Sequence, residues 1–93
     1  MQITTFQELM ARMYGDRDRE RGVAAAIAWL TEEVGEFARA VRKGTRDEQL
    51  DELGDVLAWL ASIASQLGVS LEEAAARYAD GCPRCGALPC ACS

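Results

Sequence analysis

Apolar residues recur at helical spacing along most of the chain, and no segment shows the strict alternation that is typical of a β-strand. The pattern predicts four helices, at about 5–15, 21–43, 46–67 and 70–80. The charged segment "GDRDRERG", at 15–22, is interpreted as a solvated connection between the first two helices, with a frayed helix end as the alternative. The predicted fold class is therefore all-α, with two long central helices and a short helix on each side.

Capping residues support these helix boundaries. A hydroxyl residue followed three places later by glutamate satisfies free N–H groups at a helix start. This arrangement occurs three times, beginning at Thr5, Thr45 and Ser70. Glycine is common just beyond a helix end. Such glycines are present at Gly44, Gly68 and Gly81. The short turn "RKGT" joins the long helices and predicts an antiparallel helical hairpin as the core of the fold.

The two long helices are apolar on most of their sides. One stripe of the helix at 21–43 consists of Val23, Ile27, Leu30, Val34, Phe37 and Val41. Alanines cover its other sides, and the second long helix has a similar stripe of leucines. A helix that is apolar on most sides is normally buried on most sides. We therefore expect a homo-dimer or tetramer, in which hairpins pack into a helical bundle.

Composition and charge narrow the classes of function. The chain has 93 residues, 49% apolar and 27% charged, as expected of one globular domain. Its net charge of −5 argues against a nucleic-acid partner, which would require a basic face. No segment resembles a signal peptide or a membrane span, so we expect a cytoplasmic protein without a membrane partner. The chain has no histidine, which excludes histidine-based catalysis and histidine metal ligands.

Acidic residues gather on one side of each long helix, opposite the apolar stripe. They are Glu32, Glu33 and Glu36 on the helix at 21–43 and Glu48, Asp51, Glu52 and Asp55 on the helix at 46–67. Both groups lie at similar distances from the turn, so a hairpin brings them to one level. Like charges brought together repel one another, and a bound cation would relieve that repulsion. Ligands that are all oxygen suit Mg²⁺ or Mn²⁺; the alternative is an ordinary solvated face.

Other residues of the long helices could complete such a site. Gly35 and Gly54 occupy the same offset beside the acids, and a glycine inside a helix costs about 1 kcal/mol relative to alanine. They are predicted to leave room for a ligand or for a close helix neighbour.

Two tryptophans and two basic residues are candidate substrate-binding groups. Trp29 and Trp59 lie one turn from the acids and could stack on a base or fill a subunit interface. Arg39 and Lys43 could contact phosphates, although Arg39 is also spaced to pair with Glu36.

The last residues carry all four cysteines, Cys82, Cys85, Cys90 and Cys92, in the pattern C-x₂-C-x₄-C-x-C. In a cytoplasmic protein this spacing favours a structural Zn²⁺ site, and the alternatives are disulfides or free thiols. The predicted organisation is an all-α domain at 1–81 and a zinc-knuckle-like tail at 82–93.

The stretch "LTEEVGEFARAV", followed by "DELGDVLAWLASIA", resembles the MazG-type nucleotide pyrophosphohydrolases, which are all-α enzymes marked by ExxE, a spacer and ExxD. The resemblance covers about residues 20–80. It implies that Glu33, Glu36, Glu52 and Asp55 bind Mg²⁺. It also implies hydrolysis of a (d)NTP to the monophosphate and pyrophosphate, usually to clear non-standard or surplus nucleotides. Glu32 matches the first acid of the family's frequent "EE" pair, which implies a role in orienting or deprotonating the attacking water. Glu32 and the metal ligand Glu36 are the candidate catalytic residues.

Alternatives to this function remain. The dUTP/dCTP hydrolases and phosphoribosyl-ATP pyrophosphohydrolase have related architectures, although "GEF" and "ELGDVL" are closer to MazG. The Lys and Arg residues that the family often places on a later helix have only Arg77 as a counterpart. A different class of function is a non-enzymatic helical interaction module with a zinc-binding tail.

Overall fold

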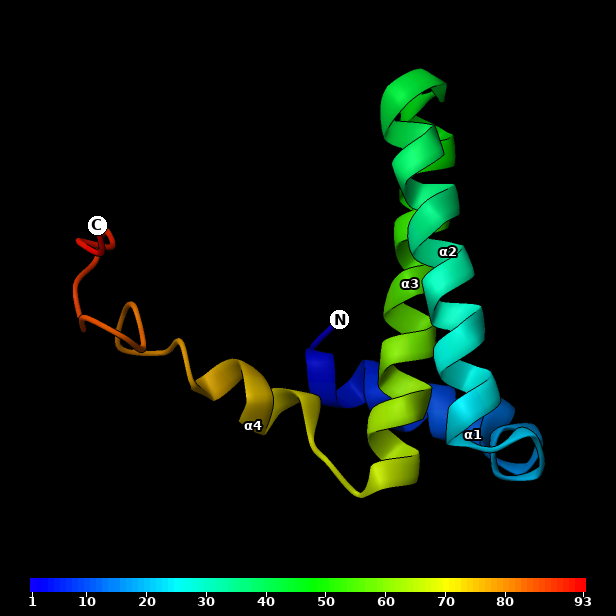
Figure 1. Ribbon diagram of the computed structural model, residues 1–93. Helices are drawn as coiled ribbons and strands as arrows, with labels where there is room; N and C mark the ends of the chain where they lie inside the picture. Colours follow the sequence, from blue (N-terminus) through cyan, green and yellow to red (C-terminus); the bar gives the residue numbers. More distant parts are fainter.

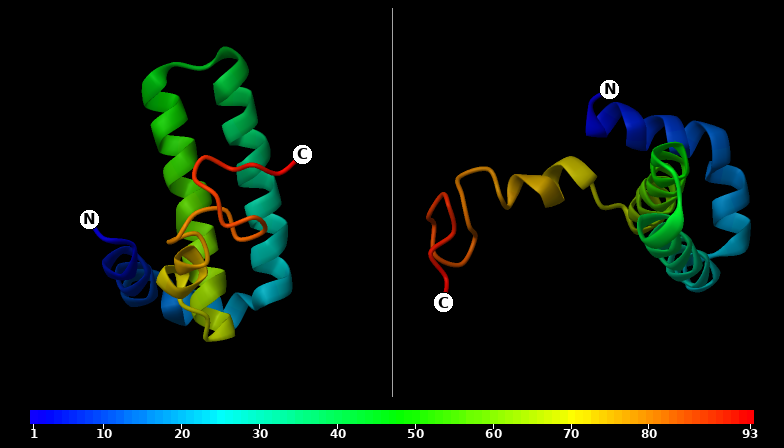
Figure 2. Two further views of the ribbon diagram at one scale, coloured as in Figure 1. Left: turned by 90° about the vertical axis from the view of Figure 1, so that its left-hand side faces the viewer. Right: turned by 90° about the horizontal axis from the view of Figure 1, so that it is seen from above.

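The computed structural model describes all 93 residues and contains four helices and no strand, which confirms the all-α class (Figure 1). The helices are α1 (Ile3–Arg21), α2 (Val23–Lys43), α3 (Arg46–Leu67) and α4 (Leu71–Ala76). The helices α2 and α3 stand side by side, and α1 crosses the end of this pair that lies away from their connecting turn (Figures 1 and 2). The short α4 and the C-terminal residues project away from the other three helices.

The turn between α2 and α3 is fixed by local hydrogen bonds. The Thr45 hydroxyl accepts from the Glu48 backbone N–H at 3.2 Å, and Glu48 accepts from the Thr45 N–H at 3.4 Å, which is the predicted capping box. Gln49 donates to the Ala40 carbonyl at 3.1 Å and so ties α3 to α2. A Cβ at Gly44 would lie 2.8 Å from the Ala40 Cα, so this position requires glycine.

The prediction of a solvated connection at 15–22 is wrong, because α1 continues to Arg21. Asp16 pairs with Arg19, and Asp18 pairs with Arg21 at 3.2 Å, so oppositely charged side chains three residues apart support the helix. The helix ends only at Gly22, where φ is +86°. This charged segment is therefore an ordered part of the fold.

The ends of the two shorter helices also differ from the prediction. Helix α1 begins at Ile3, so Thr5 lies inside it and does not cap it. Helix α4 ends at Ala76, well before Gly81, because residues 77–80 form turns. Ser70 does cap α4, accepting from the Glu73 N–H at 3.2 Å.

Hydrogen bonds from Gln7 and Thr4, both on α1, hold the start of α4 in place. The Gln7 side chain donates to the Val69 carbonyl at 2.8 Å and accepts from the Leu71 N–H at 2.9 Å. The Thr4 hydroxyl donates to Glu72 at 2.7 Å. The start of α4 is thus anchored to α1, whereas the tail that follows it has no such contact with the helices.

Buried and half-buried positions of α2 and α3 recur at intervals of three and four residues, the pattern of two helices packed side by side. We call these positions the hairpin seam: Ala26, Leu30, Glu33, Phe37 and Ala40 on α2, and Gln49, Glu52, Val56, Trp59 and Ile63 on α3. No large side chain in the chain is fully buried. The seam therefore combines small residues, a few large apolar residues and two carboxylates.

A second set of apolar side chains lies on the outside of the hairpin. We call it the apolar face: Ile27, Val34, Val41, Leu50, Leu53, Leu57 and Leu60, all exposed. Of the apolar stripe predicted on α2, Leu30 and Phe37 lie in the seam, whereas Val34 and Val41 are exposed on the apolar face. None of the four helices combines the length and the apolar character needed to cross a membrane.

Candidate metal centre of the helical hairpin

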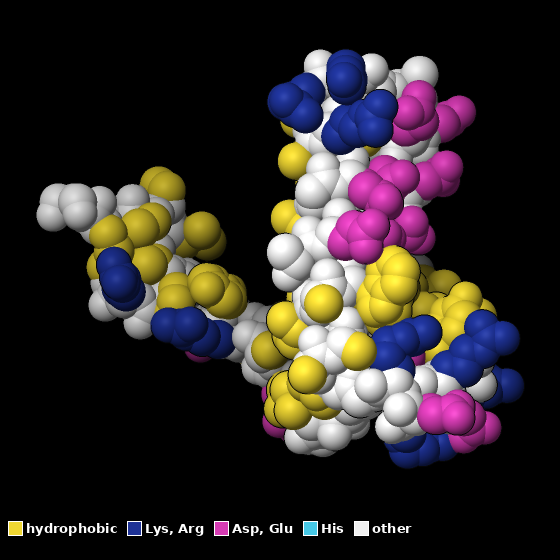
Figure 3. Space-filling model, turned by 45° about the vertical axis from the view of Figure 1, so that its right-hand side comes forward, with side chains coloured by type: hydrophobic (Ala, Val, Ile, Leu, Met, Phe, Trp, Pro, Cys, Tyr) yellow, Lys and Arg dark blue, Asp and Glu magenta, His cyan; other side chains and the backbone are white.

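Four carboxylates from α2 and α3 meet at one level of the hairpin. We call Glu33, Glu36, Glu52 and Asp55 the acidic layer. Glu33, Glu36 and Glu52 each place a carboxylate oxygen within 4.8 Å of the others, and Asp55 lies beside Glu33. Figure 3 shows acidic side chains gathered along one side of the hairpin, with basic side chains beyond both ends of the group. The structure thus brings together all four residues that the sequence predicted as metal ligands.

The position of these carboxylates within the hairpin is unusual. Glu33 and Glu52 are half-buried in the seam, where two packed helices normally place apolar residues. Glu36 and Asp55 lie at its exposed edge. One oxygen of Glu52 is buried and has no hydrogen-bond partner. A buried carboxylate oxygen without a partner destabilises the fold, so its presence calls for a ligand.

The electrostatics of the acidic layer point the same way. Loss of solvent and the neighbouring carboxylates of Glu36 and Asp55 raise the pKa of Glu33 from 4.5 to about 7. Loss of solvent and the charges of Glu36, Asp55 and Asp51 also raise the pKa of Glu52. The negative charges of Glu33 and Glu52 are therefore unfavourable in the acidic layer unless a positive charge lies beside them. A divalent cation with oxygen ligands fits this donor set.

The glycines beside the acids have no contact in this chain that requires them. A Cβ built at Gly35 or at Gly54 would meet nothing within 4 Å. The prediction that they admit a close helix neighbour is therefore wrong within a single chain, and the space beside them is open.

A cleft of about 300 Å³ lies between α1 and the acidic layer, and we call it the α1 cleft. It is lined by Tyr14, Arg17, Asp18, Arg21, Glu33, Asp55, Ala58, Trp59 and Ser62. Sequence reasoning missed the α1 residues: Arg17, Asp18 and Arg21 lie in the segment interpreted as a solvated connection, and Tyr14, inside the predicted first helix, was not identified as a candidate. A signal was present: Tyr14, Arg17, Asp18 and Arg21 have the spacing of one face of a helix.

The two tryptophans stack on each other at the edge of the α1 cleft. Their ring centroids are 6.0 Å apart and their planes differ by 6°. The Arg21 guanidinium lies 4.8 Å from the centre of the Trp59 ring. Asp18, which is only 4% exposed, forms an ion pair with Arg21. Trp59 lines the cleft, whereas Trp29 is more exposed and supports Trp59 from outside.

A second cleft, of about 520 Å³, lies between the acidic layer and the α2–α3 turn, and we call it the turn cleft. It is lined by Glu36, Arg39, Ala40, Lys43, Gly44, Glu48 and Glu52. The sequence-based alternative that Arg39 pairs with Glu36 is wrong, because neither Arg39 nor Lys43 forms an ion pair. Both cations are thus available beside the acidic layer.

Two predicted groups lie outside these clefts. Glu32 is exposed and lines neither cleft. The four cysteines lie together in the C-terminal tail, where their sulfur atoms are within 4.8 Å of one another.

Comparison with known proteins agrees with this arrangement. Residues 21–84 match the MazG nucleotide pyrophosphohydrolase domain. The uncharacterized protein YvdC of Bacillus subtilis (strain 168) is 34% identical over 90 residues, which cover 78% of this chain and 85% of that protein. The uncharacterized protein YpjD of the same organism is 45% identical over 60 residues, and the match spans only 54% of each chain. The chain described here belongs to the family of MazG nucleotide pyrophosphohydrolase domains.

Proposed function

We propose that this protein is a Mg²⁺-dependent hydrolase that converts a (d)NTP to the (d)NMP and pyrophosphate. The observation that carries the proposal is the acidic layer, in which a buried Glu52 oxygen has no partner and the pKa of Glu33 is raised. The family supplies the class of reaction. A role in clearing unwanted nucleotides is the function that this chemistry suits best.

The acidic layer is the proposed Mg²⁺ or Mn²⁺ site, held by Glu33, Glu36, Glu52 and Asp55. A bound divalent ion supplies charge neutralisation for the phosphate oxygens and lowers the pKa of a water molecule. Glu52 contributes the ligand oxygen that has no other partner in the fold.

The two clefts beside the acidic layer suit different parts of a nucleoside triphosphate. The α1 cleft contains the aromatic side chains of Tyr14 and Trp59, which offer a surface for the base. Arg17 lines the same cleft and forms no ion pair, so it can contact a phosphate. Arg39 and Lys43 offer the same charge in the turn cleft. We therefore propose that the triphosphate crosses the acidic layer between Arg17 on one side and the pair Arg39 and Lys43 on the other.

Water is the proposed nucleophile: the hairpin contains neither cysteine nor histidine, so it has no thiol nucleophile and no imidazole to activate a hydroxyl. Attack on one phosphorus breaks one phosphoanhydride bond, and the proton of water passes to a carboxylate. We retain Glu32 as the proposed acceptor, since the family resemblance gives it that role. Its exposed side chain lines neither cleft, so a Glu32→Gln variant is a stringent test of this assignment.

A nucleotide panel with identified products tests the proposal. The full-length chain is incubated with Mg²⁺ and standard (d)NTPs, dUTP, non-standard nucleotides and phosphoribosyl-ATP, and both products are quantified. We expect pyrophosphate and a monophosphate in equal amounts from at least one substrate. Release of orthophosphate and a diphosphate would contradict this chemistry. No turnover of any nucleotide would favour the interaction module instead.

A further inference from the structure

The C-terminal tail, residues 82–93, has a defined shape without an apolar core. It follows α4 and extends away from the hairpin (Figures 1 and 2). Most of its residues are exposed, and Leu88, its largest apolar side chain, is 88% exposed. A segment this short cannot hold a shape by apolar burial, and small folds of this kind normally depend on a disulfide or a metal.

The four thiols of the tail converge on one point. Their sulfur atoms all lie within 4.8 Å of one another, and the sulfur atoms of Cys82 and Cys92 are 3.7 Å apart. A disulfide would require a separation of about 2.05 Å. A tetrahedral zinc site with Zn–S bonds of about 2.3 Å has sulfur atoms about 3.8 Å apart. The observed separation matches two thiolates that share one ion.

Backbone hydrogen bonds shape the first cysteine pair into a tight turn. The Cys82 carbonyl accepts from the Gly86 N–H at 2.7 Å, and the Cys82 N–H donates to the Ala87 carbonyl at 3.0 Å. Gly86 has a φ of +72°, which favours glycine. A Cβ at Gly81, whose φ is +111°, would lie 3.0 Å from the Gly86 carbonyl oxygen. Both glycines thus permit the loop that brings the two ends of the tail together.

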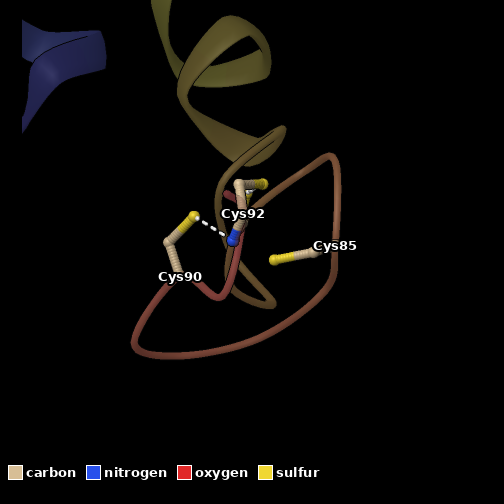
Figure 4. Close-up of side chains that lie close together, drawn as sticks. Cys85, Cys90 and Cys92 are labelled. Atoms are coloured by element: carbon tan, nitrogen blue, oxygen red, sulfur yellow. Dashed lines mark hydrogen bonds between the residues drawn. The ribbon is translucent and has the colours of Figure 1, made fainter.

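Amide groups are directed at the sulfur atoms of the other cysteines. The Ala91 N–H donates to the Cys85 sulfur at 3.4 Å, and the Cys92 N–H donates to the Cys90 sulfur at 3.4 Å (Figure 4). Such donors stabilise the negative charge that thiolates carry when they bind a metal. The tail therefore supplies the ligands and also the hydrogen bonds that support them.

We propose that Cys82, Cys85, Cys90 and Cys92 bind one Zn²⁺ ion in a closed site that holds the tail in its folded shape. Four sulfur ligands select a soft or borderline metal such as zinc, whereas the all-oxygen acidic layer suits Mg²⁺. A site with four protein ligands has no open position for substrate, so its role is structural. The site goes beyond the proposed hydrolase function, and the family match ends at residue 84, before three of its ligands.

Elemental analysis of the full-length chain tests the proposal, with any affinity tag removed. We expect about one zinc ion per chain, and Cys85→Ser and Cys90→Ser each reduce that content severalfold. The Arg84→Ala variant, changed in the same turn, keeps its zinc. A Glu33→Gln/Glu52→Gln variant also keeps it, which separates this site from the acidic layer. Helical circular dichroism confirms that each variant remains folded.

Two further measurements give independent readouts. Cobalt in place of zinc should show the visible absorption bands of a tetrahedral thiolate site, and Cys85→Ser should alter them. Trypsin should cut slowly after Arg84 in the zinc form and rapidly after zinc is removed. The proposal is overturned by a zinc-free chain with four reactive thiols, by disulfides in the freshly purified protein, or by zinc that persists in the cysteine variants.

Discussion

A small protein normally buries its apolar side chains and exposes its carboxylates. The two broad faces of the α2–α3 hairpin show the opposite distribution. Carboxylates gather on one face and reach into the seam, where Glu33 and Glu52 are half-buried. Leucines lie on the opposite face in contact with solvent, with Leu50 55% exposed and Leu57 44% exposed. The acidic face is partly covered by α1, whereas the side chains of the apolar face are 41–57% exposed.

This comparison is the basis of two proposals, that the hairpin binds a cation on one face and a second chain on the other. Acids in a seam repel one another unless a cation lies among them. Exposed leucines at helical spacing are the pattern of a helix that packs against another chain. The acidic face is the basis of the proposed chemistry, and the apolar face is the basis of the predicted homo-oligomer. Each explanation can be tested without disturbing the other.

The largest expected effect concerns the acidic face. Glu36→Gln and Glu52→Gln each remove a proposed metal ligand, so we expect kcat/KM for nucleotide hydrolysis to fall by about 100-fold or more. The oligomeric state should not change. Glu8→Gln, an exposed change on α1 outside both clefts, is the matched control and should retain activity. Full activity in the Glu52→Gln variant would remove the acidic layer from the reaction.

The next effect concerns the apolar face. A Leu53→Glu/Leu57→Glu variant places charges among the exposed leucines and should weaken self-association by about 100-fold. Sedimentation should then show the 10.1 kDa monomer, whereas the wild-type chain should sediment as a dimer or tetramer at the same concentration. Met13→Gln, an exposed apolar residue on α1, is the control. A monomeric wild-type chain would show that the apolar face has another role.

Sequence reasoning predicted the hairpin region better than its surroundings, for physical reasons. The bounds of α3 were predicted correctly, because a capping box and Gly68 mark its ends locally. The loop predicted at 15–22 was wrong, because the charged composition of the segment was given more weight than the helical spacing of Tyr14, Arg17, Asp18 and Arg21. The sequence of α2 or of α3 does not show which apolar stripe faces the other helix. Both sides of α2 are apolar enough to pack against a neighbouring helix.

The four acids of the acidic layer could be predicted because equal distances from one turn fix their common level. The contribution of α1 could not be predicted in this way. Arg17 and Trp59 are far apart in the sequence and meet in one cleft only because α1 crosses the hairpin. Long-range placement of this kind depends on tertiary packing and leaves no local signal.

A smaller effect should separate the two clefts of the acidic face. Arg17→Ala removes an unpaired cation from the α1 cleft, so we expect KM for the nucleotide to rise about 10-fold with little change in kcat. The control is Arg12→Ala, which is exposed on α1 and lines neither cleft. If KM rises instead only in an Arg39→Ala variant, the phosphates lie in the turn cleft.

The smallest expected effect is on stability in the absence of metal. The pKa of Glu33 is raised from 4.5 to about 7 in the folded state. Its favourable contribution to the free energy of unfolding is therefore complete below pH 4.5 and is lost as the pH rises through 7. The melting temperature of the metal-free protein should therefore fall by a few degrees, roughly, between pH 5 and pH 8. Glu33→Gln should flatten this dependence, and Glu8→Gln should not. A wild-type melting temperature that rises over this pH range would contradict the inferred repulsion among the carboxylates of the acidic layer.

The central claim is that carboxylates in the hairpin seam hold a divalent cation. Titration of the wild-type and Glu52→Gln chains with Mn²⁺, followed by the electron paramagnetic resonance signal of free Mn²⁺, tests it most directly. We predict saturable binding to the wild-type chain, competition by Mg²⁺, and affinity weakened by about 10- to 100-fold in the variant. Equal binding by both chains, or no binding by the wild-type chain, would contradict the claim.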